Sequence, residues 1–185
     1  MGKSAVSAML REEGVPVFDA DAEVHRLQGP GGALLPAIEA AFPGTTGAQG
    51  VDRPKLGAAV FGKPEALARL EAIVHPAVGA ARAGFLADHA AVPLVVFDVP
   101  LLFEKGGWES VDGVAVVSAP AEMQAQRVLA RPGMTAEKFA QILALQVPDA
   151  EKRARADFVI DTGVTLAETQ GAVKALVGRL LAGMG

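Results

Sequence analysis

The sequence contains no cysteine, which excludes disulfide bonds and thiolate metal sites. Its three histidines do not have the spacing of metal ligands, so we do not expect a zinc site. The net charge of −4 lacks the basic excess typical of nucleic-acid binding. Apolar runs such as Val92 to Phe97 are far shorter than the roughly 20 residues of a membrane-spanning helix. We therefore expect a cytoplasmic protein with neither nucleic acid nor membrane as a partner.

Apolar residues are plentiful, at 51% of 185 residues, and they alternate between strand-like and helix-like patterns. Four segments read as strands, three of them as continuous apolar runs that we expect to be buried on both faces: Val15–Asp21, Leu94–Val99, Val111–Ala119 and Ala156–Gly163. Helical patterns separate these segments. The alternation predicts an α/β fold with a parallel sheet flanked by helices.

Two segments are too long for single crossover helices. Residues 27–91 read as a helical insert, with breaks expected at Gly62–Pro64 and His75–Pro76, and with a turn-rich loop at "PGTTGAQG". Residues 124–155 hold two helices around a Pro-Gly break, which suggests a helical hairpin or lid, with Thr135 as a candidate N-cap.

Gly2, Lys3 and Ser4 stand directly before the first helical pattern. In a phosphate-binding loop (P-loop), backbone N–H groups hold the phosphates, the lysine neutralises phosphate oxygens, and the serine hydroxyl binds Mg²⁺. A Gly-Lys-Ser triplet alone is a weak signal. Chance occurrence is the better explanation until other segments support a P-loop.

Carboxylates follow two of the predicted strands, where open α/β sheets bind their ligands. Asp19 and Asp21 are two residues apart and would share a face in extended geometry. For Asp19 we favour a helix-capping role. For Asp21 the sequence supports a general base and a helix cap equally well. Asp98 follows the apolar Val95–Phe97 run, a weak pattern that can place an acid on Mg²⁺-bound water, and Glu104 follows "PLLF" toward the same crevice.

Basic residues offer several phosphate contacts. Arg127 and Arg131 are four residues apart, so we expect them on one helix face, either solvated or as a cationic lid over a transferring phosphoryl group. Arg53 follows a loop and could contact another phosphate. His75 precedes a proline, where a structural hydrogen bond is the more common role.

Together these segments resemble the dephospho-CoA kinase family, in order along nearly the whole chain. The matching stretches are "GKSAV", "GVPVFDADAEVHRL", "VDRPKLGAAVF", "LEAIVHPAV", "DVPLLFEKG", "QAQRVLAR" with "ILALQ", and "ADFVIDTG". The resemblance implies a P-loop fold and transfer of the γ-phosphoryl group of ATP, with Mg²⁺, to the ribose 3′-hydroxyl of dephospho-CoA. It also implies a nucleotide-binding core at 1–26, 92–123 and 147–185, a substrate domain at 27–91 and a lid at 124–146. The sequence leaves the choice between a monomer and a weak homo-oligomer open.

The resemblance also assigns roles to individual residues. It makes Asp21 the base, Ser4 the Mg²⁺ ligand, and Arg127 and Arg131 the lid arginines. The nucleotide would be held by Gly2, Lys3, Ser4 and Ala5, with Lys3 also acting in catalysis. Asp21 would also contact the acceptor, together with Arg53, His75, Pro100, Leu101 and Glu104.

Three residues depart from the family pattern. Ala5 replaces a common threonine, a mild change because Ser4 already supplies the Mg²⁺ hydroxyl. Pro132 replaces a common aspartate or asparagine, which bears on the turn of the lid, and Thr162 replaces an asparagine, which bears on one contact with adenine. A larger departure lies at the start, where the family has a strand and a glycine-rich turn before Gly-Lys-Ser. We expect Met1 to be an internal methionine of a longer protein. Two alternatives stay open, namely another small-molecule P-loop kinase and a non-catalytic remnant.

Overall fold

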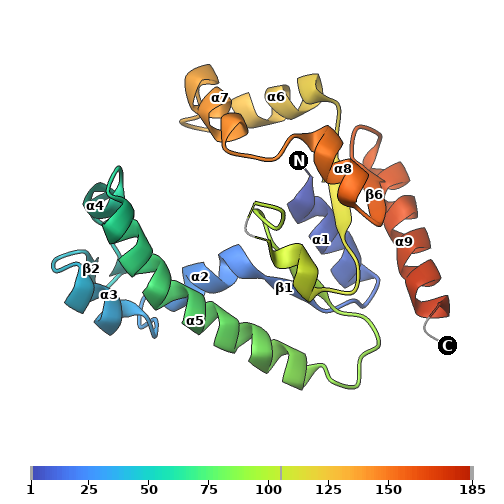
Figure 1. Ribbon diagram of the computed structural model, residues 1–185. Helices are drawn as coiled ribbons and strands as arrows, with labels where there is room; N and C mark the ends of the chain where they lie inside the picture. The colour runs from blue at the N-terminus through green and yellow to red at the C-terminus, as the bar shows by residue number, and fades with distance from the viewer. Residues whose placement is uncertain (1, 105, 184–185) are drawn as a thin grey trace. The chain divides into compact units, whose positions relative to one another are not determined.

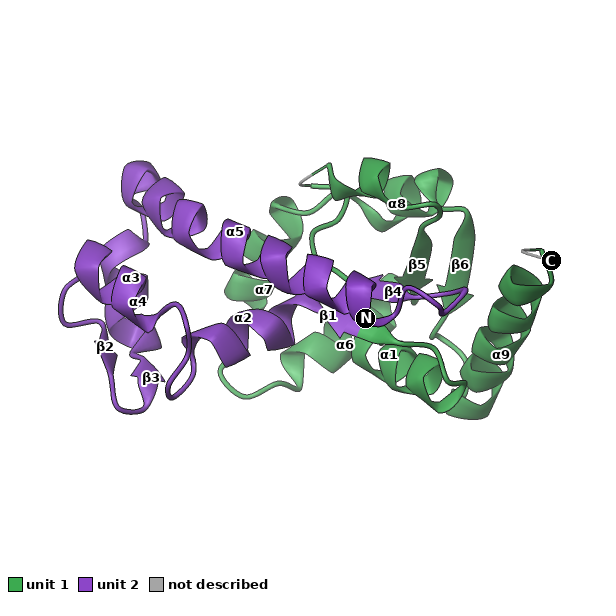
Figure 2. Cartoon of the chain, turned by 90° about the horizontal axis from the view of Figure 1, so that it is seen from below, with its two compact units in different colours: residues 1–17, 98–185 green, residues 18–97 purple. Residues whose placement is uncertain are grey.

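The computed structural model describes residues 2–104 and 106–183 (Figure 1). The chain divides into two compact units. One unit comprises residues 1–17 and 98–185, and the other comprises residues 18–97 (Figure 2). The domain boundaries expected from the resemblance stay a prediction, although the second unit contains the whole of the predicted substrate domain.

The first unit is an α/β assembly. Its helices and strands are α1 (Lys3–Glu12), the 3₁₀ helix η1 (Gly107–Ser110), β5 (Ala115–Ser118), α6 (Ala121–Leu129), α7 (Ala136–Ala144), α8 (Asp149–Arg155), β6 (Phe158–Asp161) and α9 (Leu166–Ala182). Strands β5 and β6 pair in parallel, with Val116 opposite Val159. Helix α9 packs against β6 and α1, and α8 packs against β5. The predicted parallel α/β fold is confirmed.

Burial of the strands differs from the prediction. Val116 and Ile160 are buried, but the neighbouring Val159 is 44% exposed and Ala115 is also exposed. The expectation that both strands are buried on both faces is therefore wrong. Apolar runs predict strand formation, but which side chains are covered depends on the helices that pack on each face.

Strands β1 (Val17–Asp19) and β4 (Val96–Asp98) form a second pair, and the chain passes from one unit to the other within each of them. Across the described residues, no strand pairing joins this pair to β5 and β6. Met1 lies outside the described residues. The expected earlier strand stays a prediction.

The second unit is mainly helical, as the insert prediction required. It contains α2 (Ala20–Gln28), α3 (Leu35–Ala41), β2 (Thr46–Gly47), β3 (Gly50–Val51), α4 (Arg53–Val60) and α5 (Pro64–Asp88). Its core forms around the fully buried Ile38, against which pack Leu27, Leu34, Phe42 and Leu56. Helix α5 contacts α2, α3 and α4, so it is the element that joins the other helices of this unit.

Helix α5 corrects one prediction. It runs without interruption from Pro64 to Asp88, with Pro76 inside it, so the break expected at His75–Pro76 is wrong. An internal proline costs a helix about 3 kcal/mol. Contacts with α2, α3 and α4 offset that cost.

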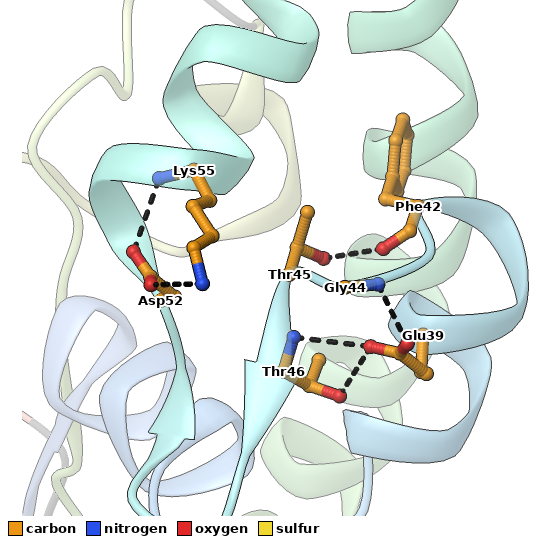
Figure 3. Close-up of polar contacts among 7 residues, drawn as sticks. All are labelled: Glu39, Phe42, Gly44, Thr45, Thr46, Asp52 and Lys55. Carbon is orange, nitrogen blue, oxygen red and sulfur yellow. Dashed lines mark hydrogen bonds and ion pairs between the residues drawn. The ribbon is translucent and has the colours of Figure 1, made fainter.

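The turn-rich loop after α3 is also more ordered than expected, because β2 and β3 form a short antiparallel hairpin within it. Figure 3 shows how the Glu39 carboxylate holds this hairpin, accepting hydrogen bonds from Gly44 N–H (2.6 Å), Thr46 N–H (3.1 Å) and Thr46 Oγ1 (2.7 Å). These bonds, led by that from Gly44, lower the pKa of Glu39. After β3, Asp52 caps α4 by accepting from Lys55 N–H. The Asp52 cap thus marks the start of α4, at Arg53.

Candidate active site

Gly2 is the N-cap of helix α1, and its backbone adopts φ 110° and ψ −3°. A Cβ atom at this position would lie 2.9 Å from Thr162 Oγ1, so both the dihedral angle and the close approach require glycine. The first intrahelical bond runs from Val6 N–H to the Gly2 carbonyl (3.0 Å). The N–H groups of Lys3, Ser4 and Ala5 therefore lie in the first turn, where a helix has no carbonyl partners for them and where its dipole favours an anion.

A buried carboxylate lies beside this helix start. The Asp98 side chain is only 3% exposed; its Oδ1 forms an ion pair with Lys3 Nζ. Its Oδ2 accepts a hydrogen bond from Ser7 Oγ (2.7 Å). Lys3 and Ser7 are four residues apart and thus share a face of α1. Ser4, the predicted Mg²⁺ ligand, is exposed in the same turn.

Asp98 and Ser7 belong to the candidate site, although the sequence gives little indication of either. Asp98 carried a weak signal as a carboxylate at the end of an apolar strand. Ser7 carried only its helical spacing from Lys3, which becomes meaningful once the position of Asp98 is known.

The predicted lid arginines differ in their surroundings. Arg127 lies in α6 and donates from Nη2 to the Thr162 carbonyl (2.9 Å). Thr162 in turn donates from Oγ1 to the Ser118 carbonyl (3.0 Å) and packs against Gly2. One residue therefore contacts both the start of α1 and the Arg127 guanidinium.

Arg131 does not share a helix face with Arg127, contrary to the prediction, because α6 ends at Leu129. Arg131 lies in the following turn, and its N–H bonds the Val128 carbonyl (3.0 Å). Pro132 explains the early end, since a residue before proline is disfavoured in helical geometry. The N-cap prediction at Thr135 is confirmed: its Oγ1 accepts from Lys138 N–H (3.3 Å).

Glu104 is tied to a distant part of the same unit. Its Oε1 pairs with Lys152 Nζ (2.7 Å) and accepts from Val147 N–H (2.9 Å). Burial alone would raise the pKa of Glu104, but these hydrogen bonds and the charge of Lys152 outweigh it and lower the pKa below its ordinary value. Pro100 and Leu101, the other predicted acceptor contacts of this loop, are exposed.

Asp19 and Asp21, the two predicted site carboxylates of the second unit, lie at different positions at the start of α2. Asp19 is the N-cap of α2 and accepts from Ala22 N–H (2.9 Å), so its predicted capping role is confirmed. Asp21 lies in the first turn of α2 and is exposed. The extended geometry that would put both side chains on one face is therefore wrong. The roles are divided: the first aspartate holds the helix, and the second is accessible to solvent.

The other predicted acceptor residues of this unit are also exposed. Arg53 is the first residue of α4, and His75 lies in the middle of α5. Their substrate contacts stay predictions.

The described ranges contain no group of three or more His, Cys, Asp or Glu residues that could hold a metal ion. Mg²⁺ nevertheless binds ATP-dependent enzymes through one or two protein oxygens together with the phosphates. The Ser4 hydroxyl and the Asp98 carboxylate are oxygen donors of that kind. Over the same ranges, no helix is long and apolar enough to cross a membrane.

A parallel α/β core with Gly-Lys-Ser at a helix start, beside a buried aspartate, defines the class of P-loop kinases. A family model described as dephospho-CoA kinase matches residues 1–168. The chain is 73% identical over 177 residues to a dephospho-CoA kinase of Novosphingobium aromaticivorans, covering 96% of this chain and 88% of that protein. It is 56% identical over 182 residues to one of Mesorhizobium japonicum, with coverages of 97% and 91%. The chain belongs to the dephospho-CoA kinase family, and it is therefore a kinase that uses ATP.

Two solved structures share the fold of this chain. The chain is similar to the crystal structure of TT1252 from Thermus thermophilus, with a TM-score of 0.80 and 36% identity over 97% of this chain and 92% of that one. A dephospho-CoA kinase from Campylobacter jejuni shares the fold, with a TM-score of 0.65, 23% identity, and coverages of 97% and 91%.

Proposed function

We propose that this protein phosphorylates the ribose 3′-hydroxyl of dephospho-CoA with ATP, giving CoA and ADP. The observation that carries the proposal is the start of α1, where Gly2 is required by geometry and Lys3 pairs with buried Asp98. Family membership supplies the acceptor, because the relatives that match nearly the whole chain are named for dephospho-CoA.

The start of α1 suits the phosphates of ATP. The N–H groups of Lys3, Ser4 and Ala5 and the helix dipole would hold phosphate oxygens. The Lys3 ammonium would leave Asp98 to neutralise the γ-phosphate, and Ser4 with Asp98 would hold Mg²⁺. When bound, Mg²⁺ neutralises charge on the β- and γ-phosphates.

The transfer itself needs an activated acceptor and a neutralised phosphoryl group. The 3′-oxygen bonds to the γ-phosphorus as the bond from that phosphorus to the β–γ bridging oxygen breaks, and ADP leaves. The exposed carboxylate of Asp21 accepts the proton of the 3′-hydroxyl. Arg127 and Arg131 stabilise the charge on the transferring group.

Acceptor binding falls to the second unit and to the loop after β4. Arg53 suits a phosphate of dephospho-CoA, while Pro100 and Leu101 offer apolar contact. His75 adds a hydrogen-bonding group. In this proposal, residues 27–91 form the substrate domain, residues 124–146 form the lid, and the remaining segments form the nucleotide-binding core. The enzyme works in the cytoplasm as a monomer or weak homo-oligomer.

The test measures ADP release with dephospho-CoA for the wild type, Asp21→Asn and Asp19→Asn. We expect Asp21→Asn to lower kcat by about 10²–10⁴-fold, the contribution of a general base. Asp19→Asn is the matched control: it makes the same change in charge two residues away, and asparagine caps helices as well as aspartate does. Equal activity of Asp21→Asn and wild type would refute the role of Asp21. Preference for a nucleoside monophosphate as acceptor would refute the proposed substrate.

A further inference from the structure

The carboxylate of Glu104 is held away from solvent by two partners from a distant segment. The Glu104 side chain is 13% exposed and the Lys152 side chain 18%. Its Oε1 accepts from both Lys152 Nζ and Val147 N–H, while Oε2 is buried. The carboxylate oxygen with hydrogen-bond partners, Oε1, is thus already bonded within the unit, and little of the side chain is open to an incoming phosphoryl acceptor.

Val147 marks a particular place in the fold. It lies in the connection 145–148, between the end of α7 and the start of α8. Helices α6 and α7 contact each other as a hairpin, and this connection is where the hairpin rejoins the rest of its unit. The segment 145–148, here called the hairpin root, is therefore held by Glu104 at its backbone.

Helix α8, which follows the hairpin root, is fixed to the same unit at two points. Its first residue, Asp149, accepts from Ser118 Oγ at the end of β5 (2.8 Å). Its fourth residue, Lys152, pairs with Glu104. The Ser118 contact fixes the start of α8, whereas Glu104 contacts both α8 and the hairpin root.

We infer that Glu104 is a positioning residue, which fixes the hairpin root and thereby sets where the α6–α7 hairpin holds Arg127 and Arg131, without contacting the acceptor. This inference rests on the proposed function of the two arginines. It replaces the role of substrate contact that the resemblance implied for Glu104.

Two substitutions separate the alternatives. Glu104→Gln removes the charge but keeps an oxygen that can accept a hydrogen bond from Val147 N–H. Glu104→Leu removes both the charge and that hydrogen-bond acceptor. We expect Glu104→Leu to lower kcat by about 10–100-fold, as misplacement of a catalytic group does, with KM for dephospho-CoA within twofold of wild type. Glu104→Gln retains most of kcat.

Hydrogen exchange provides a readout that does not depend on catalysis. Exchange of the Val147 amide should be faster in Glu104→Leu than in wild type, and close to wild type in Glu104→Gln. Thr165→Ala is the control for general loss of stability: it removes the capping box of α9, far along the chain from the hairpin root, and should change neither kcat nor Val147 exchange.

The outcomes are distinct. A raised KM for dephospho-CoA with unchanged kcat would show that Glu104 binds the acceptor and would overturn the inference. Wild-type kcat in Glu104→Leu would overturn it as well. Glu104→Leu could fail to fold. In that case, a loss of kcat in Glu104→Gln as large as in Asp21→Asn would overturn the inference, because glutamine keeps the hydrogen-bond acceptor for Val147 N–H. If wild type does not phosphorylate dephospho-CoA, the proposed function fails, and unchanged Val147 exchange would still refute the structural role of Glu104.

Discussion

Replacing Asp98 with asparagine tests the centre of the candidate site. The substitution keeps the shape of the side chain but removes the charge opposite Lys3. It also leaves one oxygen to serve both the Lys3 ammonium and the Ser7 hydroxyl, where the carboxylate has two. A hydrogen bond to a charged group contributes about 1.5–3 kcal/mol. Because the Lys3 side chain is 39% exposed, water screens its share, and we expect a total loss of about 1.5–3 kcal/mol.

The size of the protein converts this loss into a thermal shift. For a chain of this length, 1 kcal/mol moves Tm by about 2–4 °C. Asp98→Asn should therefore lower Tm by about 3–12 °C, and urea unfolding followed by circular dichroism should show a lower midpoint with an unchanged m-value. The same variant should lose activity, because the proposed Mg²⁺ ligand has lost its charge.

A double-mutant cycle assigns the effect to the Lys3–Asp98 pair. Lys3→Met and Asp98→Asn are measured singly and together. Residues in contact are not additive, so the double variant should lose less free energy of unfolding than the sum of the two single variants, by about 0.5 kcal/mol or more. Additive losses, or an unchanged Tm in Asp98→Asn, would refute the coupling between the two side chains.

Three further substitutions test other parts of the site. Gly2→Ala should raise KM for ATP at least tenfold in steady-state assays, because its Cβ would meet Thr162 and the φ of 110° is strained for alanine by about 1–3 kcal/mol. A wild-type KM would refute the close approach. Arg127→Met should lower kcat about 10²–10³-fold, because the guanidinium is proposed to contact the transferring phosphoryl group. An unchanged kcat would refute that contact and indicate a structural role through the bond to the Thr162 carbonyl. The pKa of Glu104 is lowered from the ordinary value of 4.5, so its ionised form stabilises the fold above that pH. In urea titrations, the free energy of unfolding of wild type should exceed that of Glu104→Gln most near pH 6, and the difference should shrink as pH falls below 4.5. A difference that does not change with pH would contradict the pairing of Glu104 with Lys152.

The features that the sequence predicted correctly are governed by neighbours along the chain. The alternation of apolar runs with helical patterns predicted the α/β fold, because burial of strands and helices leaves a local period. The caps at Asp19 and Thr135 were predictable for the same reason, since a cap bonds an N–H only three residues away.

The features that it missed depend on contacts made across the fold. His75 and Pro76 read as a helix break, yet α5 continues through them, and residues on either side, Val74 and Ala77, pack against the buried core of the unit. The hairpin β2–β3 read as a loop, because the Glu39 carboxylate that fixes it comes from the preceding helix. Arg131 was misplaced for a local reason: Pro132 limits the residue before it, and helical spacing alone ignores that restriction.

Glu104 shows why a motif places a residue without assigning its chemistry. Its position after "PLLF" correctly put it beyond the end of β4, where acceptor contacts are expected. Which group its carboxylate meets depends on a residue 43 positions later, Val147, and on a lysine beyond it. Both donors bind the same oxygen, Oε1, and losing them from a largely buried carboxylate is costly. The physical reason to retain a glutamate here is therefore the hairpin root, and the kcat of Glu104→Leu is the quantity that decides it.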